Sequence, residues 1–543
     1  MPVRSSVLRL LFIASGVCMT ALLTLRGTAV NVLIGLLCSL LLLYWLTYKR
    51  RVVEKVTREL SAGRIFFAAL FTLIGVYYLT QYSYIKYSML SGEILDRIGV
   101  DIGGHNDKVI SIALGVCSLT AVFLVLCWFL PKFYATAKEL IGGLDRLERR
   151  YWIIASVVMA AAILIIYNLT NVFYGAHDAA GKIIPYDVVY TADSIDQVES
   201  NAFLNIGTYE NDIRQPLFGL YAAPFALIAM ILSKVLFFIP NSYPIMMQII
   251  HVIVMQFAMI LLARMMKLQS MDKVFFLLFL SFSYPFLLFM FNIEQYIFAV
   301  FWLILFIYSY LFQWGRRDFF FIGAVGSLVT TGILFPLLSQ ARKLKEWIKD
   351  MAVNAFKFLA AATLFGQLPV ILETHTEYKG LMAFSGAEVT TLDKWYQYVN
   401  FFASCFVWPS AGEDRTTYEH ASYQLRIVDS LNMVGLIILV LAVIGFLLHY
   451  KDRFAQICMF WLAFSFVILF AVGWGTKENG LILYSFYYSW ALFALIFKLA
   501  NRLLARVEPL KFGVYGLLLG VMAVINIIGI YDLIDFGIRN YPA

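Results

Sequence analysis

The sequence is short of charged residues, which make up 14% of its 543 positions. A soluble globular domain usually carries about a quarter, so this composition argues against an ordinary soluble protein. Apolar side chains fill the deficit, since 62% of the residues are hydrophobic and the mean hydropathy is +0.80. The balance predicts an integral membrane protein.

Cysteine and histidine are also scarce, and neither is spaced to hold a metal or build a disulfide framework. The chain has six of each, without a CxxC and without two histidines at metal-ligand spacing. It also lacks the GxxxxGK that cradles phosphates, which argues against a soluble nucleotide-sugar donor. The net charge of +8 comes from basic residues in short loops between apolar runs, a pattern that reports membrane orientation and not nucleic-acid binding.

Apolar runs recur along the whole chain, and each is long enough to cross about 30 Å of hydrocarbon as a helix. The expected fold class is an all-α polytopic membrane protein with roughly 13–15 transmembrane helices. The run 318–340 begins and ends beside basic residues, which predicts a broken helix or a tight hairpin. The other spans are expected near 8–25, 29–47, 64–82, 108–130, 152–174, 244–263, 274–291, 294–313, 349–372, 429–449, 454–472, 482–500 and 511–535.

Basic loops indicate which ends of these helices face the cytoplasm. Lysine and arginine are frequent in 48–63 and 131–151, so both loops and the N-terminus are predicted to lie inside, at the cell membrane. If the apolar run 216–238 does not span, the basic loop 264–273 also lies inside, and every later basic loop follows the same rule. We prefer that reading. Four polar segments then share the outer face: 175–215, 292–295, 374–428 and 473–480.

The first of these segments is unusually acidic, and two of its acids suggest chemistry. Asp193 and Asp196 are three residues apart, so on a helix they would share a face with Ser200. A carboxylate at the mouth of an apolar cavity can act as a general base, because partial desolvation raises its pKa. A single loop acid is most simply a solvated side chain, but we expect at least one of this pair to be essential and favour Asp193.

The order of features from residue 150 to about 370 resembles the membrane glycosyltransferases of the C-type fold (GT-C), which use polyprenyl-phosphate-linked sugars. In that family a spanning helix, here 152–174, precedes an outer loop with a catalytic acid. The loop often ends in a basic residue before Pro-Leu. In "IRQPLFGLYAAP" Arg214 stands at the basic position, although Gln215 replaces a proline and an adjacent Asp-Glu pair is missing. In "FMFNIEQYIFAVFWLILF" Glu294 matches the family's second outer acid.

The resemblance implies an enzyme that moves a sugar, with inversion, from a polyprenyl phosphate to a glycan, lipid or protein acceptor on the outer face. Its partners would be these substrates and the membrane lipids, with no nucleic acid. Some family members hold a metal through the second acid and many need none, so no cofactor is required and a divalent metal has no support in the sequence. Asp193 or Asp196 would be the base.

The donor phosphate needs a cation at the membrane boundary. Arg214 suits that role because its fork matches phosphate oxygens. Lys477 is a second candidate and is equally explained by interfacial snorkelling. Tyr484 precedes Tyr487 and Tyr488, and this set is more simply an interfacial aromatic belt than a sugar platform. The acceptor-side candidates are Glu478, Arg415, His420 and Tyr484.

Three segments follow from this assignment. Residues 1–150 form a four-helix extension without a counterpart in the family core, and 151–373 form the GT-C-like core with the acidic loop 175–215. The remaining 374–543 hold the outer loop 374–428 and the C-terminal helices.

Two other functions compete with a transferase. A polysaccharide polymerase or ligase would depend on Arg415 and His420 in the long outer loop and not on Asp193. A transporter or lipid flippase should show paired broken helices in two related halves and charges at mid-membrane. Only Lys234 and Lys357 stand out inside apolar runs, and no repeat is visible, which argues against transport.

Overall fold

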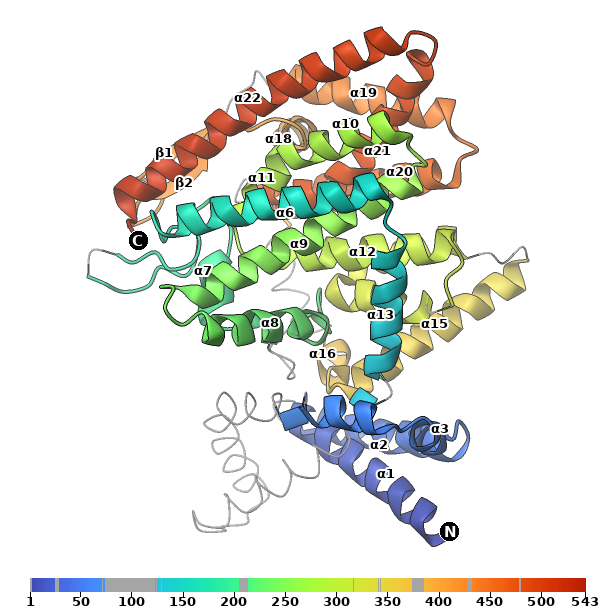
Figure 1. Ribbon diagram of the computed structural model, residues 1–543. Helices are drawn as coiled ribbons and strands as arrows, with labels where there is room; N and C mark the ends of the chain where they lie inside the picture. Colours follow the sequence, from blue (N-terminus) through green and yellow to red (C-terminus); the bar gives the residue numbers. More distant parts are fainter. Residues whose placement is uncertain are drawn as a thin grey trace. The chain divides into compact units, whose positions relative to one another are not determined.

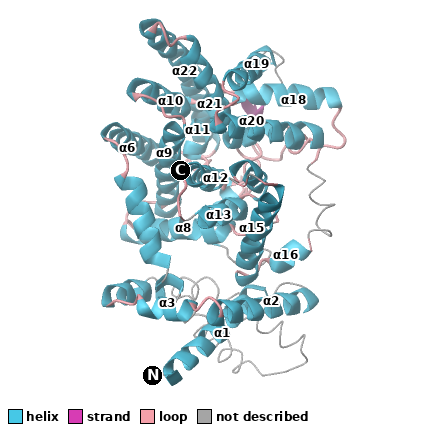
Figure 2. Cartoon of the chain, turned by 90° about the vertical axis from the view of Figure 1, so that its right-hand side faces the viewer, coloured by secondary structure: helices cyan, strands magenta, loops and turns pink. Residues whose placement is uncertain are grey.

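A computed structural model provides the fold, and helix makes up most of it (Figure 2). Within the described residues, seven helices are long and apolar enough to cross a membrane, or eight if one bent pair is a single span. This confirms the all-α polytopic membrane architecture. The total number of spans stays a prediction, because 64–82 and 108–130 fall largely outside the described residues. The structure describes residues 2–24, 29–70, 72–73, 123, 125–127, 129–178, 180–204, 213–315, 317–339, 341, 343–373, 385–426, 432–477 and 480–543.

The chain divides into two compact units, of which the first comprises Met1–Asp145, Ile206–Leu217 and Val353–His375. In this unit α1 packs along α2, and the Thr20 hydroxyl lies 2.8 Å from that of Ser39. Its core is apolar and includes Phe12, Leu43 and Val56. The elements are α1 (Pro2–Thr24), α2 (Ala29–Tyr48), α3 (Val52–Arg58) and α16 (Leu368–Leu372), and α15 (Leu344–Leu364) contributes residues to both units.

The second unit holds the rest of the chain and contains the longest helices. In the order of the sequence they are α6 (Arg146–Tyr167), α7 (Ser194–Glu199), α8 (Phe218–Val235), α9 (Ser242–Met265), α10 (Ser270–Phe282), α11 (Tyr284–Phe291), α12 (Tyr296–Leu311), α13 (Arg317–Ser327), α14 (Phe335–Leu338), α18 (Thr391–Ser404), α19 (Asn432–Leu448), α20 (Arg453–Ser465), α21 (Ser485–Leu503) and α22 (Glu508–Asn540). Short 3₁₀ turns cover Ala202–Leu204, Val329–Leu334 and Gly480–Tyr484, and a π-helix covers Phe466–Val472.

Helices α9 and α21 lie at the centre of this unit. Their most apolar windows are 89% buried, compared with 17% for α6 and 28% for α22. Figure 1 shows α6, α9 and α12 side by side, with α22 passing over α10. A helix that is apolar all round is buried in protein or in lipid. We infer that α9 and α21 pack against protein, whereas α6 and α22 expose most of their apolar surface.

Several expected runs have a different local structure from a plain span. The run 318–340 is broken into α13, a 3₁₀ turn and α14, which confirms a broken helix. The run 274–291 consists of α10 and α11, bent by 58° where Ser283 is extended and Pro285 opens the new helix.

The expected loop 374–428 needs correction, because its described part contains α18 and an antiparallel hairpin. The hairpin pairs β1 (Ala411–Asp414) with β2 (Ser422–Leu425), so that Glu413 stands opposite Tyr423. Helix α18 is amphipathic, and the interpretation of 374–428 as a single polar loop does not account for it.

Polar contacts identify the two ends of the α6–α9 pair. At one end Glu148 is 1% exposed and binds Arg264 and Lys273, at 2.5 and 2.8 Å. At the other end the Asn241 amide donates to the Tyr174 hydroxyl at 2.9 Å. Residues 148 and 264–273 therefore share one end of the bundle, as the loop-charge argument requires. Which side of the membrane that end faces stays a prediction.

Candidate functional site

The acidic loop is ordered around the short helix α7. Asp193 is the residue before the helix and is exposed, whereas Ile195 and Gln197 are buried and Asp196 is half-buried. Ser200 follows the last helical residue, and its amide donates to the Asp196 carbonyl at 2.8 Å. The Gln197 amide likewise donates to the Asp193 carbonyl at 2.9 Å, so helical bonds reach both residues that flank α7. The helical face shared by Asp193, Asp196 and Ser200 stays a prediction.

Glu294 lies in the connection between α11 and α12 and is the acid that organises this loop. Its side chain is buried, with 4% of the residue exposed. Its Oε1 accepts the backbone N–H of Asp193 at 2.7 Å. Beside it, the Gln295 amide donates to the Gln197 side chain at 2.9 Å. These two bonds bring together positions about a hundred residues apart, and they join the two acidic segments that the sequence singled out.

The electrostatics of the three acids differ because their burial differs. Burial raises the pKa of the Glu294 carboxyl well above its usual range, and the negative charge of Asp193 raises it further. Partial burial also raises the pKa of Asp196, against a lowering hydrogen bond from the Tyr186 hydroxyl. Burial and neighbouring negative charge both favour the protonated form of a carboxyl. Glu294 is thus suited to hold the loop in place through its hydrogen bond to the Asp193 amide.

The glycine-rich segment 473–480 and the tyrosines at 484, 487 and 488 lie near these acids. A Cβ at Gly480 would lie 2.9 Å from the Thr191 hydroxyl, so the turn lies against the acidic loop. The Trp474 indole donates to the Tyr484 hydroxyl at 2.9 Å. The Tyr484 ring lies 6.2 Å from that of Tyr296, two residues beyond Glu294. Tyr484, predicted on the acceptor side, therefore packs near Tyr296, and Tyr296 lies two residues beyond the buried Glu294.

The neighbouring tyrosines have another role. Tyr487 and Tyr488 are only 4% and 5% exposed, so the interpretation as an interfacial belt is wrong for both. A belt residue must reach the lipid headgroups, and these two rings pack inside the bundle against Tyr296, Phe401 and Trp461. Their contribution is to the packing that holds the turn.

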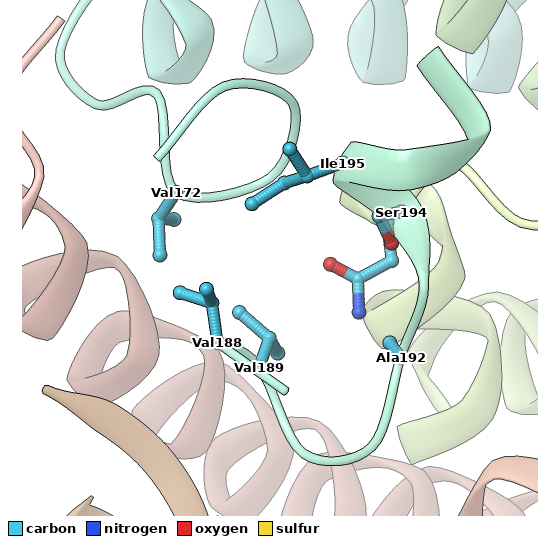
Figure 3. Close-up of a pocket in the computed structure, with 7 residues that line it drawn as sticks. Val172, Val188, Val189, Ala192, Ser194 and Ile195 are labelled. Carbon is cyan, nitrogen blue, oxygen red and sulfur yellow. The ribbon is translucent and has the colours of Figure 1, made fainter. Parts of the chain in front are cut away.

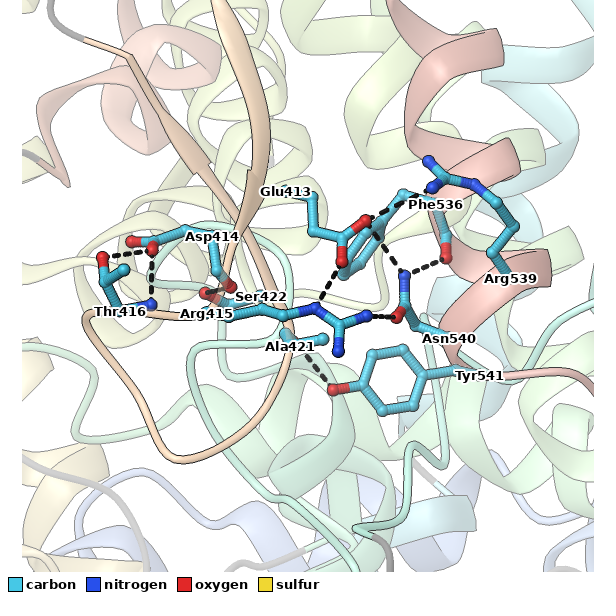
Figure 4. Close-up of polar contacts among 10 residues, drawn as sticks. All are labelled: Glu413, Asp414, Arg415, Thr416, Ala421, Ser422, Phe536, Arg539, Asn540 and Tyr541. Atoms are coloured by element: carbon cyan, nitrogen blue, oxygen red, sulfur yellow. Dashed lines mark hydrogen bonds and ion pairs between the residues drawn. The ribbon is translucent and has the colours of Figure 1, made fainter.

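The β-hairpin attaches to the acidic loop from the other side. Tyr190 and Tyr423 form a backbone bond of 2.8 Å, and the Tyr423 amide in turn donates to Val188. In the hairpin, Arg415 binds Glu413 at 2.6 Å and the Asn540 side chain at 2.8 Å (Figure 4). His420 is half-buried, and its ring lies 5.4 Å from that of Tyr418. Arg415 and His420, two of the four predicted acceptor-side residues, thus have contacts that stabilise the hairpin.

A small cavity of about 10 Å³ lies beside the acidic loop, and Ala192 and Ser194, the neighbours of Asp193, belong to its lining. Its lining is apolar apart from Ser194 and Asn292, and Figure 3 shows Ser194 at its edge opposite Val172 and Val188. Asn292 is fully buried, and neither its amide atoms nor the Ser194 hydroxyl has a partner among the described residues. Such groups are normally satisfied by ordered water. Sequence reasoning did not single out Asn292.

The two predicted donor-phosphate residues belong to different units. Arg214 is exposed and belongs to the first unit, whereas Asp193 and Glu294 belong to the second. Lys477 is exposed at the end of the glycine-rich turn in the second unit. Glu478 lies outside the described residues. In the part of the chain that the structure describes, no three His, Cys, Asp or Glu side chains are grouped to hold a metal.

Comparisons with protein-family models, with curated proteins and with solved structures found no match.

Proposed function

We propose that this chain is a membrane glycosyltransferase that uses a polyprenyl-phosphate-linked sugar as donor. The observation that carries the proposal is the bond between the Asp193 backbone and the buried Glu294 carboxyl. It supports a built acidic site at one end of a membrane helix bundle, with an exposed acid held by a buried one. A solvated loop would not need a buried carboxyl to position it, since burial of that group is costly.

In the proposed reaction, the acceptor hydroxyl oxygen attacks the anomeric carbon of the donor sugar. Its proton passes to the carboxylate of Asp193, or of Asp196, as general base. The bond between the anomeric carbon and the phosphate oxygen breaks, and its electron pair leaves with the polyprenyl phosphate. A single displacement of this kind inverts the anomeric configuration. Glu294 holds the base in position and takes no proton from the substrate.

The competing functions have weaker support. A polymerase or ligase mechanism would need Arg415 and His420 to face substrate. Arg415 is exposed and binds Glu413, and the His420 ring stacks on Tyr418, so no contact of these residues specifically favours that mechanism. A transporter would need charges at mid-membrane. The buried ion pairs of Glu148 lie instead at an end of α6 and α9.

The test is sugar transfer by the purified protein in liposomes that contain polyprenyl phosphates carrying radiolabelled sugars, together with a membrane extract as acceptor. We expect label to leave the polyprenyl fraction and polyprenyl phosphate to be released. Asp193→Asn should lower the rate by about 100-fold or more, the scale of general-base catalysis. Glu199→Gln is the matched control, since Glu199 is an exposed acid at the far end of α7. Transfer at equal rates in wild type and Asp193→Asn would contradict the role of Asp193.

A further inference from the structure

The turn Gly473–Lys477 has an unusual backbone conformation, and an unusual type of helix precedes it. It follows the seven-residue π-helix Phe466–Val472, and π-helical segments are rare and often lie at functional sites. Gly473 and Gly475 have φ values of +77° and +78°, which glycine adopts without strain. Backbones that alternate between right- and left-handed conformations can direct successive N–H groups toward an anion.

The turn leaves hydrogen-bond donors unused. The Thr476 amide donates to Gly473, and the Gly480 amide donates to Gly475. The amides of Gly475 and Lys477 have no acceptor in the described part of the chain. Two backbone donors on this segment of five residues therefore have no acceptor among the residues that the structure describes.

Two ammonium groups accompany these amides. A Cβ at Gly473 would lie 2.7 Å from both Cε and Nζ of Lys394, so the Lys394 side chain from α18 lies over the turn. Lys394 is half-buried and Lys477 is exposed. Neither has an acidic partner among the residues that the structure describes. Within the described residues these two ammonium groups are therefore available to an anionic ligand.

The position of α18 on the turn is fixed by further contacts. The Gln397 side chain donates to the Thr476 carbonyl at 3.1 Å, one helical turn beyond Lys394. The Tyr484 ring would meet a Cβ at Gly475 at 2.7 Å, and Gly480 lies against Thr191. The cations thus border the acidic site without pairing with its carboxylates.

We infer that Lys394 and Lys477, with the amides of Gly475 and Lys477, bind the phosphate group of the donor. This inference rests on the proposed function and adds Lys394, which lies in a different element from the residues that the sequence suggested. Lysine binds phosphate as a point charge. The phosphate gains negative charge as the glycosidic bond breaks, so preorganised cations and amides stabilise the transition state more than the ground state.

The test measures binding of polyprenyl monophosphate to the full-length protein in nanodiscs, with the chain-matched polyprenol, which lacks phosphate, as reference. We expect Lys394→Gln and Lys477→Gln each to weaken binding of polyprenyl monophosphate by about tenfold or more, on the scale of a charge-assisted hydrogen bond. Binding of the polyprenol should not change. Lys267→Gln is the matched control, because Lys267 is an exposed lysine of the α9–α10 connection. Inorganic phosphate should compete only at high concentration.

Three outcomes would overturn the inference. If wild type prefers polyprenyl monophosphate to polyprenol but both lysine variants retain that preference, the phosphate is held elsewhere and the proposed function survives. If wild type shows no such preference, the donor class of the proposed function is wrong as well. If the variants lose equal affinity for phosphatidylglycerol vesicles, the two lysines contact anionic lipid in general.

Discussion

Substitution of Glu294 separates a positioning acid from a catalytic or metal-binding one. Glu294→Gln keeps the shape of the side chain and one acceptor oxygen for the Asp193 N–H, and it removes the ability of the group to ionise. Burial and the charge of Asp193 raise the pKa of Glu294, which favours the protonated form of its carboxyl. We therefore expect Glu294→Gln to keep most of the transfer activity.

Glu294→Ala should behave differently. It removes the acceptor for the Asp193 amide at 2.7 Å and for the amide of Gln295. Two hydrogen bonds of about 1 kcal/mol each, plus the cavity left in a 4% exposed site, amount to about 2–3 kcal/mol of lost loop positioning. That corresponds to a fall in rate of roughly 30- to 150-fold.

Two measurements check this reasoning on the purified variants. The first is the rate of sugar transfer, and the second is hydrogen exchange of the Asp193 amide, which should lose protection in Glu294→Ala and keep it in Glu294→Gln. Thermal unfolding of all three proteins shows whether the bundle stays folded. If Glu294→Gln is as inactive as Glu294→Ala while the Asp193 amide stays protected, the reaction needs the charge of Glu294, and the positioning role is wrong.

The remaining predictions concern pH and stability. Tyr186→Phe removes the hydrogen bond that lowers the pKa of Asp196, so that pKa rises; if Asp196 is the base, the acidic limb of the pH–rate profile moves to higher pH, and an unmoved limb assigns the base to Asp193. Glu148→Gln removes the buried carboxylate that binds two half-buried cations and should cost about 3–5 kcal/mol, measured as a lower midpoint of thermal unfolding; an unchanged midpoint would show that the cluster is solvated. Asn526→Leu removes three bonds that tie α22 to the backbone of residues 282, 406 and 408 and should lower the same midpoint by several degrees, since unsatisfied buried backbone groups are costly.

Part of the candidate site was predictable from the order of features along the chain. The acids of 190–199 and the acid before α12 were both singled out, and the structure joins them through Asp193 and Glu294. What the pattern could not say is which acid is buried. The spacing of features along the chain predicts which segments carry the acids. Whether an acid is buried depends on the packing of α7 against the α11–α12 connection, about a hundred residues away in the sequence.

The same limit of sequence patterns applies to Lys394, Asn292 and the hairpin, because their roles depend on tertiary packing. Lys394 stands in a polar stretch without a motif, and only the packing of α18 on the turn at Gly473 gives it a role. Tyr487 and Tyr488 were read as lipid-facing because aromatic residues at a helix end are common at membrane interfaces. The bundle instead surrounds them with protein.

The sequence by itself determined the class of the protein, because apolar length and the scarcity of charge act locally and need no partner. It also determined the break within 318–340, which arises from residues close together in the chain. Only the tertiary structure decided which apolar helices face protein, with α9 and α21 buried and α6 and α22 largely exposed. The physical reason is that an apolar side chain is equally satisfied by lipid and by protein, so its pattern reports removal from water and not what replaces it.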